Sequence, residues 1–533
     1  MADYNPYGAE SPVSINSDED DESFLVKPAQ SRKGCPSILK RHILCGMSFL
    51  GFFFVYCLRV NLSVALVAMV NLTAESHANE TSECPHEITD NTTTPAPPTT
   101  QGEFNWTPEM QGIILGSFFY GYILTQIPGG WIAEKYGGKI PFGAGVLCTS
   151  VLTLVTPIAA RTSWILLVVV RILEGIGEGV TFPAMHAIWG RWAPPLERSK
   201  LGSITYSGAH MGTVVSMPLS GLLCQYGFDG GWPSVFYIFG SVSCVWCLVW
   251  FILIHDTPAS HPTITAEEKH YIESTLGHID GKKYTHPPWK DIFKSMPNYA
   301  ILVTHMCNNW GFYTLLTCLP TYMKEVLHFD IKKNSFLSAV PYLVFWVLAI
   351  CSGQIADYLR FKGILSTTTV RKIFNTLGLG LPGVCLVGMS FIICDSQHAV
   401  LVLTLAVGLN GFNMAGYSIN HLDISAVFAG TLMGISNSFA TIPGMVGPYV
   451  VGLLTNDDQT RGQWQIVFYI AAGIYAFGAL FYVIFGSGET QYWNSDEDRE
   501  RHNRSRLDTI QGVGGAVYQP LPTEDSEYVN KYD

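Results

Sequence analysis

Apolar segments long enough to cross a lipid bilayer recur through most of this sequence. A spanning helix needs about 20 mostly apolar residues, because its backbone must satisfy its own hydrogen bonds inside the hydrocarbon. Of the 533 residues, 48% are hydrophobic and only 14% are charged, which leaves too little polar surface for a soluble globule of this size. Twelve candidate segments begin near residues 43, 109, 140, 163, 200, 233, 298, 334, 370, 399, 427 and 464. The sequence therefore predicts an all-α membrane protein with twelve transmembrane helices.

A polar stretch at 255–297 separates six of these segments from the other six. The two sets share a short motif, GWIAE at 130–134 after the second segment and GQIAD at 353–357 after the eighth. Small residues, an acid and nearby cations suit close helix approach and a charge-paired gate, and paired halves around a midplane site are a known transporter architecture. We expect a tail at 1–42, a six-helix half at 43–254, a linker at 255–297, a second six-helix half at 298–486 and a tail at 487–533.

The positions of the basic residues indicate the orientation of the chain. Lys27, Arg32, Lys33, Lys40 and Arg41 precede the first apolar segment, whereas the loop at 71–108 after it has no Lys or Arg. Basic residues collect on cytoplasmic loops, so both tails and the linker are predicted to be cytoplasmic. Residues 1–34 are acidic and polar, so we expect no cleavable signal peptide before the first segment.

The loop at 71–108 carries four N-glycosylation sequons, at Asn71, Asn79, Asn91 and Asn105. The basic residues independently place this loop on the luminal or extracellular side of the membrane. Glycosylation of Asn-X-Ser/Thr is a modification of surface loops in secretory compartments. We therefore expect a glycoprotein whose sugars lie on the luminal side.

One arginine lies inside the first apolar segment. Arg59 would cost roughly 2.5–3.5 kcal/mol at the bilayer centre, so it is expected to face the bundle interior and serve a substrate or proton path. Its planar guanidinium can hold a carboxylate by two parallel hydrogen bonds, which predicts a site for a small organic anion. Tyr56, Tyr120, Tyr206 and Tyr313 could line the same cavity with hydroxyls and ring faces. The alternatives are a structural arginine and tyrosines that serve helix packing or the membrane interface.

The fourth apolar segment gathers ionisable side chains on one face. Arg171, Glu174 and Glu178 are three and four residues apart, so they lie together on a helix. Arg171 can neutralise one acid, which leaves the other to take up and release protons, and His186 could extend such a relay. The alternative is a static ion-pair network that holds helices together.

Two further patterns in the apolar segments bear on mechanism. Gly175, Gly177 and Gly179 alternate through the fourth segment, a spacing that permits close helix approach or local unwinding beside the acids. His421 and Asp423, near the end of the tenth segment, are better suited to a gate than to a binding site.

Five longer stretches of sequence carry a specific pattern. They are YCLRVNLSVA at 56–65, GSFFYGYILTQIPGG at 116–130, RILEGIGEGVTFPAMH at 171–186, WAPPLERSK at 192–200 and TIPGMVGP at 441–448. Together they resemble the organic-anion (anion/cation symporter) branch of the major facilitator superfamily, over residues 40–490. Within that branch the chain is most similar to the sialin-like members. The resemblance implies the major facilitator fold, with Arg59 at the substrate carboxylate and proton coupling at the acids of the fourth segment.

The resemblance predicts a proton-coupled exporter of sialic acid or similar acidic sugars. The expected compartment is the lysosomal membrane, with a synaptic or secretory vesicle or the plasma membrane as alternatives. Where vesicular glutamate transporters have a histidine and an arginine, this chain has Leu115 and Asn308, which disfavours a dedicated glutamate carrier. Carriage of glutamate, aspartate or phosphate stays open. So do a non-transporting membrane receptor and an anion channel whose flux needs no proton gradient.

The two tails carry candidate sorting signals. Leu25 and Val26 end an acidic, dileucine-like motif, and Tyr518 with Leu521 forms a tyrosine-based motif that cytoplasmic adaptors could read. The sequence contains no catalytic triad, metal-ligand cluster or nucleic-acid-binding surface. We expect a transporter and not an enzyme, with a small organic anion and the lipid bilayer as partners, protons as the coupling ion and no cofactor or metal.

Overall fold

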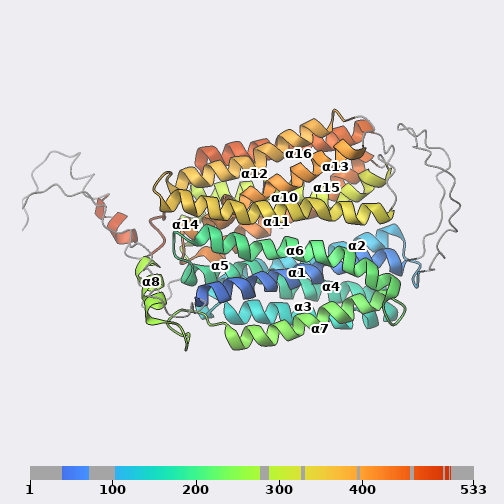
Figure 1. Ribbon diagram of the computed structural model, residues 1–533, viewed down its shortest axis with the longest axis horizontal. Helices are drawn as coiled ribbons and strands as arrows, with labels where there is room; N and C mark the ends of the chain where they lie inside the picture. The colour runs from blue at the N-terminus through green and yellow to red at the C-terminus, as the bar shows by residue number, and fades with distance from the viewer. Residues whose placement is uncertain are drawn as a thin grey trace, which may run out of the picture. The chain divides into compact units, whose positions relative to one another are not determined.

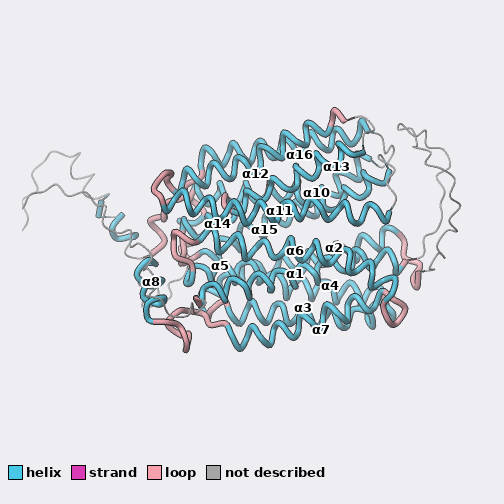
Figure 2. Tube along the Cα trace, in the orientation of Figure 1, coloured by secondary structure: helices cyan, strands magenta, loops and turns pink. Residues whose placement is uncertain are grey.

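The computed structural model describes residues 39–70, 102–276, 287–325, 331–392, 396–455, 461–495, 498–502 and 504–505. The described residues are almost entirely helical (Figure 2). In the first half of the chain the helices are α1 (Lys40–Met69), α2 (Pro108–Tyr136), α3 (Lys139–Thr162), α4 (Trp164–Gly179), α5 (Thr181–Trp192), α6 (Arg198–Tyr226), α7 (Trp232–Leu253) and α8 (Ala266–Leu276). They continue with α9 (Trp289–Ile292), α10 (Met296–Glu325), α11 (Ile331–Phe361), α12 (Thr367–Met389), α13 (Ser396–Leu409), the 3-10 helix η2 (Asn410–Met414), α14 (Tyr417–Ile424), α15 (Ala429–Thr455) and α16 (Arg461–Phe485).

Each predicted apolar segment coincides with one long helix or with helices in line. Every predicted start lies within three residues of the start of such a helix, from Lys40 in α1 to Arg461 in α16. Within the described residues, eight helices are long and apolar enough to cross a membrane by length and composition. The all-α membrane fold predicted from the sequence is confirmed.

The long helices form two layers, one from α1–α7 and the other from α10–α16 (Figure 1). In the first layer α1 packs on α6, α2 on α4, and α3 on α7. The second layer repeats this pairing, with α10 on α15, α11 on α13, and α12 on α16. The two layers meet where α6 packs against α11 and α2 against α15. The repeated pairing agrees with the short motif that occurs once in each half of the sequence.

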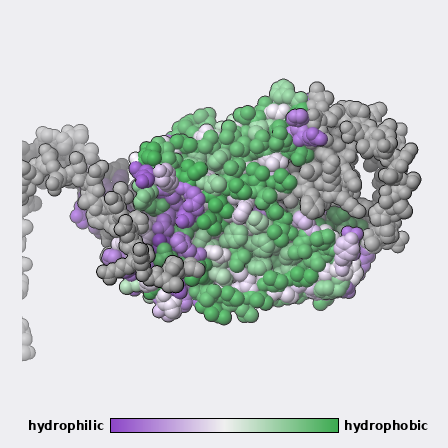
Figure 3. Space-filling view, in the orientation of Figure 1, coloured by the Kyte–Doolittle hydropathy of each residue, from purple (hydrophilic) through white to green (hydrophobic). Residues whose placement is uncertain are grey.

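Large apolar side chains cover the outward faces of the helices (Figure 3). Leu124, Val245, Leu248, Ile252 and Leu480 are each exposed over more than half of their surface. Apolar surface in water costs about 25 cal/mol per Å², whereas contact with lipid tails carries no such cost. These faces therefore meet the bilayer, and polar side chains lie in the interior or at the helix ends.

The fourth predicted segment is interrupted between α4 and α5. α4 ends at Gly179, and Val180 separates it from α5. A Cβ on Gly175 would meet the backbone of Phe118 and Tyr122 on α2, and one on Gly179 would meet the carbonyl of Tyr122. The alternating glycines thus allow both close approach to α2 and a helix break, which together hold the acids of α4 beside α1 and α2.

Candidate functional site

Glu174 is held within the first half by several partners. Arg171 Nη1 lies 2.5 Å from Glu174 Oε2, and the hydroxyls of Thr153 and Thr156 donate to Glu174 Oε1 at 3.2 Å each. Arg171 and Glu174 are both buried. Both carboxylate oxygens of Glu174 therefore have hydrogen-bond partners. This arrangement is typical of a static ion-pair network, the alternative that the sequence left open.

Glu178, one turn further along α4, pairs with Arg59 of α1. Arg59 Nε donates to Glu178 Oε1 at 2.6 Å, and Arg59 Nη2 forms an ion pair with the same oxygen. Glu178 is fully buried, and its other oxygen, Oε2, has no hydrogen-bond partner among the described residues. The arginine expected to hold an anion is thus joined to an acid expected to carry protons, a contact that spacing along one helix could not reveal.

Three aromatic rings surround the Arg59 guanidinium. Its Cζ lies 4.8 Å from the ring centroid of Tyr56, 5.0 Å from that of Phe118 and 4.6 Å from that of Tyr122. The Phe118 ring also lies 5.2 Å from Arg171 Cζ, so one ring contacts both arginines. Ring faces attract cations, by about 2 kcal/mol in desolvated sites. The rings therefore position Arg59 by contacts that do not depend on Glu178.

Arg59, Tyr56 and Tyr122 line a cavity between the two halves. Its wall is built by α1, α2, α5 and α6 from the first half and by α10, α11, η2, α14 and α15 from the second. Among the described residues of the wall, Arg59 is the only one with a permanent charge.

Three of the four predicted tyrosines line this cavity. Tyr56, Tyr206 and Tyr313 belong to its wall. Tyr120 does not, because it is 59% exposed on the outer surface of α2. Tyr122 takes its place in the wall, and its hydroxyl accepts a hydrogen bond from Nδ2 of Asn437 on α15 at 3.0 Å. Side chains two residues apart on a helix point about 200° apart, so Tyr120 faces away from the cavity. The prediction that Tyr120 lines the binding cavity is therefore corrected.

His186 is buried on α5 next to the cavity wall. Its Nδ1 lies 2.6 Å from the Tyr206 hydroxyl and 3.1 Å from the Phe182 carbonyl oxygen. Its Nε2 lies 3.2 Å from the carbonyl oxygen of Ser418, which belongs to α14 of the second half. His186 therefore connects the two halves through hydrogen bonds and is separate from the Arg59–Glu178 pair.

The second half supplies wall residues that the sequence did not identify as binding groups. His421, expected at a gate, lines the cavity, and its Nε2 lies 2.8 Å from Ser436 Oγ. Ser436 Oγ lies 3.3 Å from Nδ1 of His305, another wall residue. Asn308, noted only as a departure from a related pattern, is also in the wall. The polar wall residues missed altogether are Tyr122 and His210 of the first half and His305, Asn309, Asn410, Tyr417, Ser418 and Asn437 of the second. Their only sequence signal is a polar side chain within an apolar segment, which helix packing also produces.

The two copies of the repeated motif each cap a helix of the opposite half. Glu134 accepts hydrogen bonds from the backbone N–H and the hydroxyl of Thr431, at 2.6 Å each, in the first turn of α15. Asp357 accepts from the backbone N–H of Ser199 at 3.3 Å and of Lys200 at 2.7 Å, in the first turn of α6. Carboxylates satisfy the free N–H groups of a helix start and interact with its dipole. These caps join the halves at the end where α1 begins, the predicted cytoplasmic end.

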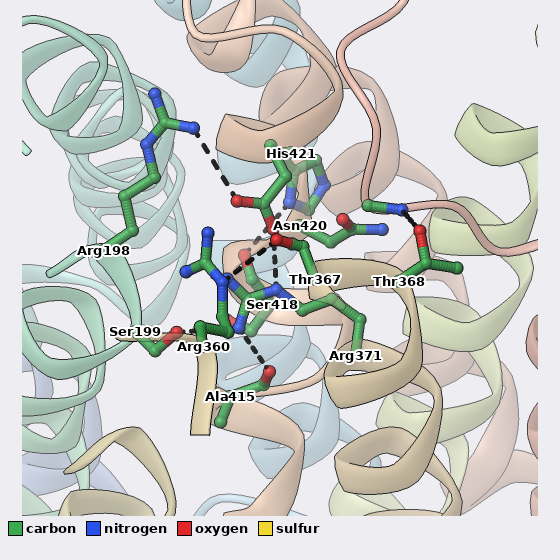
Figure 4. A network of polar contacts seen from close by, with 12 residues as sticks. Arg198, Ser199, Arg360, Thr367, Thr368, Arg371, Ala415, Ser418, Asn420 and His421 are labelled. Atoms are coloured by element: carbon green, nitrogen blue, oxygen red, sulfur yellow. Dashed lines mark hydrogen bonds and ion pairs between the residues drawn. The ribbon is translucent and has the colours of Figure 1, made fainter. Parts of the chain in front are cut away.

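Charged residues form a second link at this end, where Arg198 and Arg371 lie around a shared acid (Figure 4). Arg371 Nε donates to Asp423 Oδ2 at 2.6 Å, and its Nη1 donates to Ser199 Oγ at 2.7 Å. Arg198 Nη1 lies 3.7 Å from Asp423 Oδ1. Asp423 thus connects arginines from both halves, as a gate requires.

Several predicted modification and sorting sites fall outside the described residues. These are Asn71, Asn79, Asn91, Leu25, Val26, Tyr518 and Leu521. Asn105 is described, and it is exposed in the segment before α2. Among the described residues, no group of three or more His, Cys, Asp or Glu side chains could hold a metal ion.

Comparison with known proteins gives consistent matches over most of the chain. Residues 48–448 match the family described as Major Facilitator Superfamily. Sialin from Homo sapiens is 53% identical over 470 residues, which cover 87% of this chain and 92% of that protein. Vesicular glutamate transporter 2 from Homo sapiens is 45% identical over 472 residues, which cover 87% and 77%. The solved structure of the proton:xylose symporter XylE bound to 6-bromo-6-deoxy-D-glucose aligns with a TM-score of 0.61 over 85% of this chain and 97% of that one, at 12% identity, a likeness of fold alone.

Proposed function

Because this chain belongs to the Major Facilitator Superfamily, in the branch that includes sialin and the vesicular glutamate transporters, we propose that it exports sialic acid or similar acidic sugars together with protons. Its named relatives are transporters. The two halves would expose the cavity alternately to the lumen and to the cytosol. The lysosomal membrane is the proposed location, because the acidic lumen there supplies the driving protons.

The ion pair between Arg59 and Glu178 at the cavity carries this proposal. A substrate carboxylate would need the same guanidinium that Glu178 contacts. Protonation of Glu178 would remove its charge and leave Arg59 to bind the substrate through two parallel hydrogen bonds. The acidic lumen supplies that proton and the near-neutral cytosol removes it, so substrate would leave the lumen.

Charge balance explains why one proton would move with one monocarboxylate. With Glu178 ionised and the cavity empty, the charges of Arg59 and Glu178 sum to zero. With Glu178 protonated and a carboxylate on Arg59, they again sum to zero. A protonated Glu178 without substrate would leave a buried, unpaired guanidinium, at a cost of several kcal/mol. The halves would therefore exchange conformations either empty or with both proton and substrate bound.

Carriage of glutamate, aspartate or phosphate is the second candidate, supported by the 45% identity to a vesicular glutamate transporter. The cavity supports glutamate and aspartate less, because its described wall offers one permanent cation to a substrate with two carboxylates. A receptor that has kept the fold would show no flux, and an anion channel would show flux that follows voltage.

Delivery and coupling complete the proposal. Cytoplasmic adaptors would read the motifs at 25–26 and 518–521, and glycans on the 71–108 loop would face the lumen. Protons are the proposed coupling ion, and no cofactor is needed for the cycle.

Substitution of Leu25, Val26, Tyr518 and Leu521 by alanine is expected to move the protein to the plasma membrane, which microscopy of tagged protein would detect.

The test uses purified full-length protein in liposomes and radiolabelled sialic acid, glutamate and phosphate. Sialic acid uptake that needs an imposed proton gradient and collapses with a protonophore would support the proposal. Uptake of glutamate or phosphate alone would favour the second candidate. An absence of uptake for all three substrates would contradict transport and favour the receptor.

A further inference from the structure

The cavity has one charged side and one uncharged side. Arg59, with Tyr56 and Tyr122 around it, belongs to the first half. The second half contributes carboxamide, imidazole and hydroxyl groups and no Lys, Arg, Asp or Glu among the described wall residues. A ligand whose carboxylate is bound at Arg59 would therefore place the rest of its structure against neutral hydrogen-bonding groups.

Asn308 is one of these neutral groups and is held by other buried amides. Its Oδ1 accepts two hydrogen bonds, from Asn410 Nδ2 at 2.7 Å and from Asn413 Nδ2 at 2.9 Å. Both of those nitrogens also donate to the carbonyl oxygen of Gly378, at 3.1 and 2.9 Å. Because Oδ1 is held in this way, the amide plane of Asn308 is fixed and its Nδ2 lies on the opposite side from Asn410 and Asn413.

The side chains of Asn308, Asn410 and Asn413 are held in place by the packing around them. Asn308, Asn410 and Asn413 are all buried. A Cβ on Gly378 would collide with the Asn413 side chain, so this glycine lets the amides reach the α12 backbone. Buried polar groups are costly unless paired, and a network with this many internal bonds holds its members in one geometry.

The network leaves specific atoms for a ligand. Asn308 Nδ2 has two N–H groups, of which one can serve the neighbouring Tyr417 hydroxyl and the other a ligand. Asn410 uses its nitrogen on Asn308 and Gly378, so its Oδ1 remains as an acceptor at the wall. One donor, Asn308 Nδ2, and one acceptor, Asn410 Oδ1, match the hydrogen-bonding needs of an amide group or of several hydroxyls.

We propose that Asn308 and Asn410 form a subsite for the uncharged, hydrogen-bonding part of the substrate. The substrate class is then a monocarboxylate whose far end carries an acylamino group or several hydroxyls. The subsite rests on the proposed function, because Arg59 must hold the carboxylate. The subsite would disfavour substrates with a second carboxylate, because that carboxylate would be buried among neutral groups without a cation.

The test compares two ring carboxylates that differ in their neutral groups. N-acetylneuraminic acid has hydroxyls and an acetamido group, whereas cyclohexanecarboxylate has neither. Binding of each to the purified full-length protein would be measured at pH 5.5 by competition and by calorimetry. Asn308→Ala is expected to weaken N-acetylneuraminic acid about tenfold, the loss of one well-ordered hydrogen bond, and to change cyclohexanecarboxylate less than about twofold.

Two control variants separate the subsite from general damage. Asn298 is buried on the same helix outside the cavity wall, and its Nδ2 donates to the carbonyl oxygen of Ile292 at 3.2 Å, so Asn298→Ala is expected to leave the ratio of the two affinities unchanged. Arg59→Lys is expected to weaken both ligands, because a point charge replaces a planar fork. If Asn308→Ala does not fold, Asn308→Ser, whose hydroxyl can still accept from Asn410, provides the same comparison.

The outcomes distinguish this inference from the proposed function. Equal weakening of both ligands by Asn308→Ala, or no weakening of N-acetylneuraminic acid, would overturn the subsite while leaving Arg59 as the carboxylate site. Unchanged binding of both ligands by Arg59→Lys would overturn the proposed function. Selective weakening of N-acetylneuraminic acid by Asn308→Ala would establish the subsite.

Discussion

The two glutamates of α4 differ because of their partners and not because of their burial. Both are almost fully buried. Glu174 receives hydrogen bonds from Arg171, Thr153 and Thr156, whereas Glu178 contacts Arg59 through one oxygen only. Replacement of either acid removes a charge, but only Glu178 shares its partner with the proposed substrate. Substitutions of Glu174 and Glu178 should therefore have different effects on the protein.

Glu178→Gln is expected to abolish proton-driven accumulation while sialic acid exchange across the membrane continues. Glutamine resembles the protonated acid and cannot release a proton, so Arg59 stays available for substrate at every pH. Uptake with a proton gradient would be compared with counterflow in liposomes without one. Accumulation by Glu178→Gln equal to that of the wild type would remove Glu178 from the coupling mechanism.

Glu174→Gln is expected to act mainly on stability, because it leaves Arg171 buried beside a neutral side chain. Loss of one partner of a buried pair costs about 3–5 kcal/mol. Thermal unfolding of the purified variant should show the loss, whereas the pH dependence of its remaining flux should match the wild type. A shifted pH profile at normal stability would instead assign proton transfer to Glu174.

Phe118→Leu is expected to raise the KM for sialic acid roughly fivefold with little change in kcat, since its ring contacts both Arg59 and Arg171. Leucine keeps the apolar burial but has no ring face for the guanidinium groups. Phe142→Leu is the control, because Phe142 is fully buried in a different part of the first half. Equal effects of the two variants would mean that Phe118 acts through packing alone.

At the scale of helices, the first turns of α6 and α15 are each capped by a carboxylate from the other half. The acids are Asp357 on α11 and Glu134 on α2. Each cap joins the two halves at the predicted cytoplasmic end, so it would stabilise the conformation closed there over one that is open there. A lost N-cap costs about 0.5–2 kcal/mol, enough to change the ratio of conformations several-fold.

Glu134→Ala is expected to speed hydrogen exchange in the first turn of α15 without affecting the first turn of α6. Asp357→Ala should give the reverse, because each acid caps only one helix. Exchange at the two helix starts would be followed by mass spectrometry of the purified protein. Exchange that rises equally at both starts in either single variant would show that the two caps open together.

At the scale of the whole molecule, the halves touch closely where α2 meets α15. A Cβ on Gly130 would collide with the backbone carbonyl of Gly430, and a Cβ on Gly434 would collide with the backbone carbonyl of Gln126. These glycines let the two halves close at the predicted cytoplasmic end. The change of conformation must separate the two halves again at this end. The small size of Gly130 and Gly434 therefore favours only the conformation in which this end is closed.

Gly130→Ala is expected to hold α2 and α15 apart and to lower the rate of sialic acid uptake several-fold. Gly116→Ala on the same helix is the matched control, because a Cβ there meets nothing within 4 Å. Uptake in liposomes would be compared at equal amounts of folded protein. Similar uptake by both variants would show that the closed end tolerates the extra methyl group.

Much of this architecture could be predicted from the sequence because a bilayer imposes strong local rules. Twelve apolar segments, a repeated motif and the buried ionisable groups Arg59, Arg171, Glu174 and Glu178 are visible without coordinates. A spanning segment must be long, apolar and helical, and a charge within it must face inward. These constraints act along the chain, so each helix start was predicted within three residues.

Only the tertiary structure decided which side chains meet. It paired Glu178 with Arg59 on another helix, turned Tyr122 and not Tyr120 toward the cavity, and placed Asn308 in the wall. The physical reason is that lipid and protein interior are both apolar, so hydropathy shows that a segment spans the membrane but not which face turns inward. Facing depends on the complementary packing of helices distant in sequence, which exists only in the assembled bundle.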